Sequence, residues 1–122
     1  PHAVCRVEDV DAMDLTEVGP AFEFHPRFAP HRVNTEFIQL LDRKNIRMRV
    51  WERGSGETWA CGTGASASVM ACILQGYTED ETFVHLRGGR LAIRLDRETN
   101  RLFMTGPAVE VFHGTVDLPE NL

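Results

Sequence analysis

Residues 60–75 of this chain read ACGTGASASVMACILQ, and the predicted fold is built around them. After the cysteine it is rich in Ala and Ser, includes four larger apolar residues and carries no charge. A helix without a charged face is expected to be buried on all sides. Gly76 follows at a position where helices commonly end in a left-handed residue. We therefore predict a buried helix over residues 62–75 at the centre of the domain.

Segments with the composition and alternation of β-strands lie on both sides of this helix. An acidic loop offers Asp14 or Thr16 as the N-cap of a second, short helix over residues 15–24. Strands around one uncharged helix predict an α+β fold, in which a mixed β-sheet or barrel is wrapped around the central buried helix. The predicted strands cover residues 3–7, 35–42, 45–53, 81–87, 90–96, 101–105 and 109–116, the second and third forming a hairpin.

Composition and charge narrow the classes of function. The 122 residues suit one domain, which we expect to cover residues 1–122. The formal charge of −5 argues against a nucleic-acid partner, because such proteins concentrate Lys and Arg. No apolar run approaches the roughly 18 residues of a membrane span, so no membrane is expected. The three cysteines include no Cys-x-x-Cys pair and fit neither a disulfide framework nor a metal site. Because the sequence also shows no signal peptide at its start, we expect a protein of the reducing cytoplasm.

Cys61 carries the strongest chemical signal, because it stands between a predicted strand and the first turn of the predicted helix. The unpaired N–H groups and the positive dipole end of a helix stabilise a thiolate. Gly62 and Gly64 add no side chain, so a bound carboxylate can approach the backbone closely. The same stretch thus offers a base and an anion site. Cys72 within the helix and Cys5 in an apolar strand are interpreted as buried and unreactive.

Four segments of the chain, in the same order, carry a resemblance to a known family. Residues 51–64 resemble the signature around the C-terminal catalytic cysteine of diaminopimelate epimerases. Residues 1–4, Pro-His-Ala-Val, are similar to the family's Asn-Pro-His-Ala segment with its Asn trimmed off. Residues 25–28 match its His-Pro-x-Phe element, and residues 32–37 match its Asn-containing strand. The resemblance covers essentially the whole chain.

The resemblance implies a cofactor-independent isomerase of lysine and peptidoglycan biosynthesis. In this family two related domains, each a mixed sheet on a central helix, enclose the active site and contribute one cysteine each. One cysteine removes the α-proton as a thiolate, and the other protonates the opposite face, without pyridoxal phosphate or metal. This chain would be the C-terminal half, with diaminopimelate as substrate, the N-terminal half of the same enzyme as partner and a homodimer as a further candidate assembly.

The resemblance also implies roles for individual residues near the reacting carbon. Carried over position by position, Cys61 is one of the two thiols. The backbone N–H groups of Gly62 and Thr63 would bind the reacting α-carboxylate, where preorganised donors stabilise developing charge. His2 and Glu52 would lie beside the thiols as assisting polar groups.

The distal end of diaminopimelate carries a second ammonium and a second carboxylate. The resemblance assigns these groups to Asn34, Glu52 and Arg53. An arginine can grip a carboxylate through two parallel hydrogen bonds, and a glutamate can pair with an ammonium. Glu57 belongs to the same signature but has no evident substrate role, so we interpret it as structural.

Three other functions are compatible with parts of this pattern. Proline racemase and other members of the same superfamily would keep a cysteine before the helix, but a substrate with one charged end does not need the Glu52-Arg53 pair. A cysteine hydrolase would need a base to activate Cys61. The chain could also be a non-catalytic binding or structural module, since neither Cys5 nor Cys72 is followed by a Gly-rich turn that would supply a second thiol.

Overall fold

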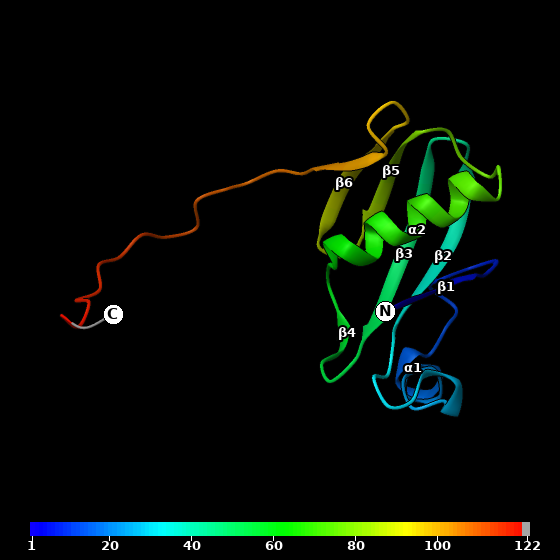
Figure 1. Cartoon of the computed structure of the whole chain (residues 1–122). Helices are drawn as coiled ribbons and strands as arrows, with labels where there is room; N and C mark the ends of the chain where they lie inside the picture. The colour runs from blue at the N-terminus through cyan, green and yellow to red at the C-terminus, as the bar shows by residue number, and fades with distance from the viewer. Residues whose placement is uncertain (121–122) are drawn as a thin grey trace.

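The structure is a computed structural model, and it describes residues 1–120. None of the helices in this range is long and apolar enough to cross a membrane. The elements, shown in Figure 1, follow one another as β1 (His2–Arg6), α1 (Leu15–Glu23), η1 (Pro26–Phe28), β2 (Asn34–Asp42), β3 (Asn45–Glu52), β4 (Gly56–Thr58), α2 (Gly62–Leu74), β5 (Glu81–Leu86), β6 (Gly89–Asp96) and β7 (Arg101–Thr105).

The strands form one mixed sheet in the order β1-β2-β3-β5-β6-β7, and β4 pairs with β3 beside this path. The β1–β2 and β3–β5 pairs are parallel, whereas the remaining pairs are antiparallel. Figure 1 shows α2 lying across one face of the sheet and α1 at the end of the sheet near β4. The predicted α+β class, with a mixed sheet wrapped on a central helix, is confirmed.

Two local signals set the first half of the fold. The Asp14 carboxylate accepts the Thr16 N–H at 2.9 Å and so caps α1. The Asp42 carboxylate accepts the Lys44 N–H at 2.7 Å and a side-chain N–H of Asn45, which closes the turn between β2 and β3. Both the short helix and the hairpin therefore agree with their predicted ranges to within a residue.

The main core lies between α2 and the sheet. From α2, Ala65, Val69 and Cys72 are fully buried. The Ser68 hydroxyl donates a hydrogen bond to the Met48 sulfur at 3.3 Å, which satisfies a polar group inside this core. The apolar residues that the sheet contributes include Ile46, Met48, Val50, Val84 and Ile93.

The expected burial of α2 on all sides is wrong for this chain. Leu74 at its end is 72% exposed, and Thr63 in its first turn is exposed as well. Residues 66, 67, 70 and 71 are only partly buried. The reason is topological: the sheet runs from β1 to β7 as an open path, so it covers one side of the helix and does not close around the other.

The strand predicted over residues 109–116 is also absent from the structure. This segment pairs with no strand in residues 1–120, and Figure 1 shows it running away from the sheet. Its apolar side chains are exposed, with Val111 at 87% and Phe112 at 85%. A β-strand needs a hydrogen-bonding neighbour, and alternating apolar residues alone do not supply one.

Gly19 in α1 is expected to resist substitution. A Cβ at this position would clash with the ring of Trp51. Alanine usually stabilises a helix interior by roughly 0.5–1 kcal/mol relative to glycine, but overpacking of this kind costs about 1–3 kcal/mol. Gly19→Ala should therefore lower the free energy of unfolding, measured by urea titration. In a Trp51→Ala background the penalty should vanish, and an equal penalty in both backgrounds would contradict this explanation.

Candidate active site

Cys61 is the N-cap residue of α2, in extended conformation with φ −141° and ψ 105°. Its sulfur accepts the backbone N–H of Gly64 at 3.4 Å and lies 3.6 Å from the Thr63 hydroxyl. Its carbonyl accepts the N–H of Ala65 at 2.9 Å, which begins the helix. The thiol therefore lies at the N-terminus of α2, with the Gly64 N–H donating to its sulfur.

Both glycines beside the thiol have side chains packed close to them, buried Glu36 at Gly64 and the flexible end of exposed Met104 at Gly62. A Cβ on Gly64 would lie 2.6 Å from Oε1 of Glu36, and a Cβ on Gly62 would lie 2.8 Å from the sulfur of Met104. The sequence predicts that these glycines admit a ligand. In the structure they admit neighbouring side chains, while the N–H groups of Gly62 and Thr63 belong to the first turn and have no acceptor within the helix.

The other two cysteines lie in apolar surroundings. Burial raises the pKa of the Cys72 thiol to about 11, and burial also raises the pKa of the Cys5 thiol. Cys72 is fully buried in the core against the sheet, and Cys5 is half-buried in β1. Desolvation disfavours the thiolate at both positions. Cys61 is also buried, at 8% exposed, but the Gly64 N–H donates a hydrogen bond to its sulfur.

Brief treatment with iodoacetamide at neutral pH should modify Cys61 before the other cysteines. The reason is that the Gly64 N–H donates a hydrogen bond to the Cys61 sulfur, whereas burial raises the pKa of both other thiols. Peptide mapping by mass spectrometry gives the order of modification. A Cys61→Ala variant serves as the control, in which the fast phase of labelling should disappear. Faster labelling of Cys72 than of Cys61 would contradict this prediction.

Strand pairing brings three of the sequence-predicted residues together. The parallel register of β1 and β2 places His2 opposite Asn34. The side-chain oxygen of Asn34 accepts the backbone N–H of Arg53 at 3.0 Å. The Nδ1 atom of His2 lies 2.7 Å from Oε1 of Glu36, the residue whose carboxyl group also approaches Gly64. A continuous set of contacts therefore leads from Arg53 through Asn34 and His2 to the first turn of α2.

Glu52 and Arg53 lie at the end of β3, where the chain turns into β4. The Thr58 hydroxyl donates a hydrogen bond to the Glu52 carboxylate across this β3–β4 pair. Burial is the main cause of the raised pKa of the Glu36 carboxyl, and repulsion from the Glu52 charge adds to it. The Arg53 guanidinium donates to the carbonyl of His31 at 2.8 Å, so its side chain runs back over the segment before β2.

Glu23 is a residue of this neighbourhood that sequence reasoning did not identify. Its buried carboxylate accepts hydrogen bonds from Arg32 at 2.7 Å, from the Trp51 indole at 2.7 Å and from the Gly54 N–H at 2.9 Å. Although burial opposes ionisation, these donors hold the pKa of the Glu23 carboxyl below its ordinary value. Glu23 thereby ties α1 to the turn that carries Arg53.

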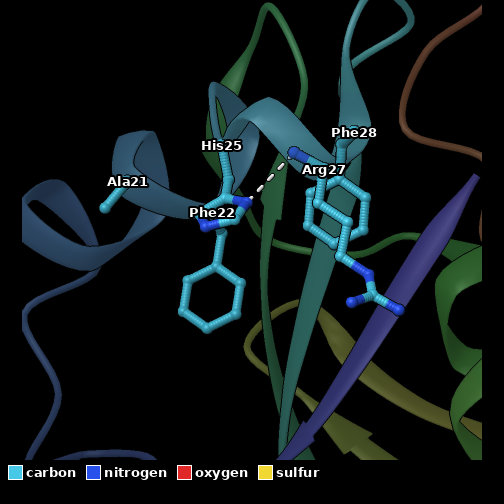
Figure 2. A pocket seen from close by; sticks show the side chains of 5 residues that line it. All are labelled: Ala21, Phe22, His25, Arg27 and Phe28. Carbon is cyan, nitrogen blue, oxygen red and sulfur yellow. Dashed lines mark hydrogen bonds between the residues drawn. The ribbon is translucent and has the colours of Figure 1, made fainter.

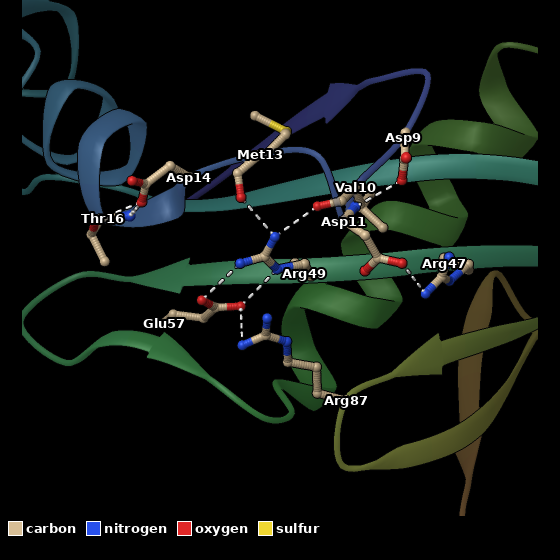
Figure 3. A network of polar contacts seen from close by, with 10 residues as sticks. All are labelled: Asp9, Val10, Asp11, Met13, Asp14, Thr16, Arg47, Arg49, Glu57 and Arg87. Carbon is tan, nitrogen blue, oxygen red and sulfur yellow. Dashed lines mark hydrogen bonds and ion pairs between the residues drawn. The ribbon is translucent and has the colours of Figure 1, made fainter.

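A second network, shown in Figure 3, fixes the chain just before Cys61. The Arg49 guanidinium grips Glu57 through two hydrogen bonds of 2.8 and 3.0 Å and donates to the carbonyls of Val10 and Met13. Arg87 pairs with the same carboxylate at 3.0 Å. The Arg49 guanidinium holds the pKa of the Glu57 carboxyl below its usual range. Glu57 is therefore a partner of arginines, in agreement with its structural interpretation.

A hollow of about 400 Å³ is lined by residues of α1, of η1 and of the turn between them. Figure 2 shows its lining, in which the backbone N–H of Arg27 donates to Nδ1 of His25. None of the sequence-predicted site residues lines this hollow; its lining residues are Ala21, Phe22, His25, Arg27 and Phe28. Within residues 1–120 no group of three or more His, Cys, Asp or Glu side chains is arranged to hold a metal ion.

Solved structures resemble this chain in fold. A phenazine biosynthesis protein of the PhzF family from Enterococcus faecalis aligns with a TM-score of 0.61 and 16% identity, covering 80% of this chain and 35% of that protein. A PhzF-family protein from Bacillus anthracis aligns with a TM-score of 0.57 and 23% identity, covering 83% of this chain and 33% of that protein. At such identities the likeness concerns the fold alone.

Sequence comparisons are more specific. The chain is 58% identical to the diaminopimelate epimerase of Agathobacter rectalis over 118 residues, 97% of this chain and 41% of that protein. It is 52% identical to that of Acetivibrio thermocellus, over 98% of this chain and 42% of that protein. The chain thus spans about two-fifths of the length of these relatives. The family model described as diaminopimelate epimerase matches residues 1–111, and the chain therefore belongs to the diaminopimelate epimerase family.

Proposed function

We propose that this chain forms one half of a cofactor-independent diaminopimelate epimerase and supplies Cys61 as one of its two proton-transferring thiols. The observation that carries the proposal is the position of the Cys61 sulfur at the N-cap of α2, 3.4 Å from the Gly64 N–H. Membership of the family supports the same activity. The remaining part of the enzyme, which this chain does not cover, is the proposed partner.

In the proposed reaction Cys61 and a thiol of the partner half act on opposite faces of the α-carbon. The thiolate of one takes the α-hydrogen as a proton, so an S–H bond forms and the electron pair of the broken C–H bond stays on the substrate. The thiol of the other donates its proton to the opposite face, and a C–H bond of inverted configuration forms. The two thiols exchange protonation states, and no redox change occurs.

The backbone at the start of α2 supports the charge that this step develops. The N–H groups of Gly62 and Thr63 have no acceptor within the helix and lie beside the thiol. Donors that are fixed in advance stabilise an enolate-like carboxylate without reorganisation. We assign the α-carboxylate to these two groups, and we assign His2 and Glu52 to assisting proton transfer.

Asn34, Glu52 and Arg53 form the proposed distal site. They share one end of the sheet, where Asn34 fixes the Arg53 backbone and Glu52 is held by Thr58. A carboxylate and a guanidinium at this end match the ammonium and carboxylate at the far end of diaminopimelate. The Arg53 guanidinium rests on the His31 carbonyl, and it would bind substrate through its remaining N–H groups.

The test uses a joined protein, defined as the Agathobacter rectalis enzyme in which this chain replaces the matching 118-residue stretch. It should convert LL-diaminopimelate to the meso isomer and exchange the α-hydrogen with solvent deuterium. Cys61→Ser should abolish inversion while substrate binding remains measurable by calorimetry. An active Cys61→Ser variant would remove Cys61 from the mechanism and reject the proposal.

Arg53→Lys in the joined protein should lower kcat/KM about ten- to a hundredfold, although the charge is kept. An ammonium cannot reproduce the planar, two-bond grip of a guanidinium on a carboxylate. The loss of one charged hydrogen bond is worth about 1.5–3 kcal/mol, which sets this range. Steady-state kinetics gives the value, with Arg43→Lys on the exposed β2–β3 turn as the control. An unchanged kcat/KM for Arg53→Lys would exclude Arg53 from the distal site.

A further inference from the structure

Glu36 is a buried carboxyl group for which the proposed function has no role. It lies in β2 and is 0% exposed. One oxygen, Oε1, lies 2.7 Å from Nδ1 of His2, and the other, Oε2, has no hydrogen-bond partner in residues 1–120. Burying a carboxylate is unfavourable unless its hydrogen bonds are made, and an apolar residue of similar size would fill the same space. A half-satisfied carboxyl at this depth needs an explanation.

The position of this carboxyl relative to the thiol suggests the explanation. Oε1 of Glu36 comes so close to Gly64 that a Cβ there would lie 2.6 Å away, and the Gly64 N–H is the donor to the Cys61 sulfur. Glu36 therefore lies between His2 and the helix turn that holds the thiol. The charged groups around it are His2 from β1 and Glu52 from β3, of which only His2 can donate a proton to it.

We propose that Glu36 is a positioning residue, which holds His2 in the tautomer with its proton on Nδ1 and leaves Nε2 as the proton-accepting nitrogen of the site. When the Glu36 carboxyl is ionised it only accepts hydrogen bonds, and the ring nitrogen 2.7 Å away then carries the proton. In the neutral ring the other nitrogen is then an acceptor. The catalytic use of that nitrogen rests on the proposed function, whereas the tautomer is a property of this chain.

The tautomer is measured on the purified 122-residue chain labelled with ¹⁵N. Long-range proton–nitrogen spectra at about pH 9, above the ordinary pKa of imidazole, distinguish the two ring nitrogens. The wild-type chain should show His2 with Nδ1–H, and Glu36→Leu should shift it to Nε2–H. His85, which contacts Asn45 through Nε2, should be unchanged and serves as the internal reference. A wild-type His2 with its proton on Nε2 would overturn the inference, whether or not any variant folds.

Thr35→Val is the matched control for a general disturbance of β2. Thr35 is the neighbouring residue, is equally buried, and also has a hydroxyl without a hydrogen-bond partner in residues 1–120. Its substitution should leave the His2 tautomer unchanged. A tautomer shift in Thr35→Val as large as that in Glu36→Leu would show that packing in β2, and not the Glu36 carboxylate, determines the tautomer of His2.

Kinetics of the joined protein provide the second readout. Glu36→Leu should lower kcat by about a hundredfold or more, in line with the contribution of one correctly protonated acid–base group, and leave KM within about twofold, because Glu36 does not contact substrate. Thr35→Val should retain wild-type kcat. A wild-type joined protein without activity would count against the proposed function while the tautomer result stands. Full activity of Glu36→Leu would reject only the role of Glu36.

Discussion

Purified alone, the 122-residue chain will not convert LL-diaminopimelate to the meso isomer in deuterium oxide, whereas the joined protein will. Inversion needs a base on one face of the α-carbon and an acid on the other, and Cys61 can serve only one face. General acid–base groups contribute about 10²–10⁴-fold each, and a site open to water loses further stabilisation of the developing charge. Activity of the isolated chain should therefore fall below detection.

Proton NMR of the substrate follows both exchange and the appearance of the meso isomer. The isolated chain carrying Cys61→Ala is the blank, since any residual exchange that it shares with the wild-type chain does not come from this thiol. Conversion by the isolated chain at a rate close to that of the joined protein would show that the second half is unnecessary. The two-thiol proposal would then be wrong.

Arg49→Met is expected to reduce the free energy of unfolding by about 3–5 kcal/mol, the usual effect of breaking a buried ion pair by removing one partner. The Arg49 side chain is 8% exposed, and it satisfies both oxygens of Glu57 and two backbone carbonyls at once. Methionine fills similar space but donates nothing. The Val10 carbonyl, the Met13 carbonyl and part of the Glu57 carboxylate would then lose a donor.

Urea unfolding followed by circular dichroism measures this loss. The control is Arg97→Met, because Arg97 makes the same two-bond contact with Asp80 at the surface, where water replaces the lost donors and little change is expected. The Glu57 pKa is lower in the folded chain than when unfolded. The Glu57 contribution is thus complete above roughly pH 4.3 and is lost as the pH falls through the folded-state pKa. Equal effects of the two substitutions would contradict the importance of burial.

The elements that the sequence predicted well are those that local patterns determine. The uncharged stretch of α2, the Asp14 cap of α1 and the Asp42 turn of the hairpin each depend on neighbours in the chain. The strand expected over residues 109–116 fails because strand formation depends on a partner that periodicity does not reveal. The expectation that α2 is buried on all sides is wrong for a related reason. An uncharged helix face indicates that other residues cover it, but the sequence of the helix does not show which ones.

The residues of the candidate site also differ in whether the local sequence predicts their positions. The position of Cys61 before a helix can be read from its own glycines, but the approach of His2 to Asn34 depends on a parallel register between segments 32 residues apart in the chain. The family resemblance assigns both residues to one active site, with His2 beside the thiols and Asn34 at the distal end of the substrate. Glu23 and Glu36 were missed because an isolated acidic residue in a helix or strand usually faces solvent, and only the packed structure shows that these two do not. Their roles, like those of the resemblance-derived residues, remain predictions.

The two parallel pairings also bear on how fast the chain folds. β2–β3, β5–β6 and β6–β7 are joined by short turns, so each can form with little loss of loop entropy. β1 must instead wait for β2 across a crossover that contains α1, and β3 must wait for β5 across one that contains α2. Such distant contacts raise the contact order and slow folding. We expect the hairpins to form early and β1, which leaves the ribosome before them, to dock onto the sheet late, carrying His2 into place as one of the last steps.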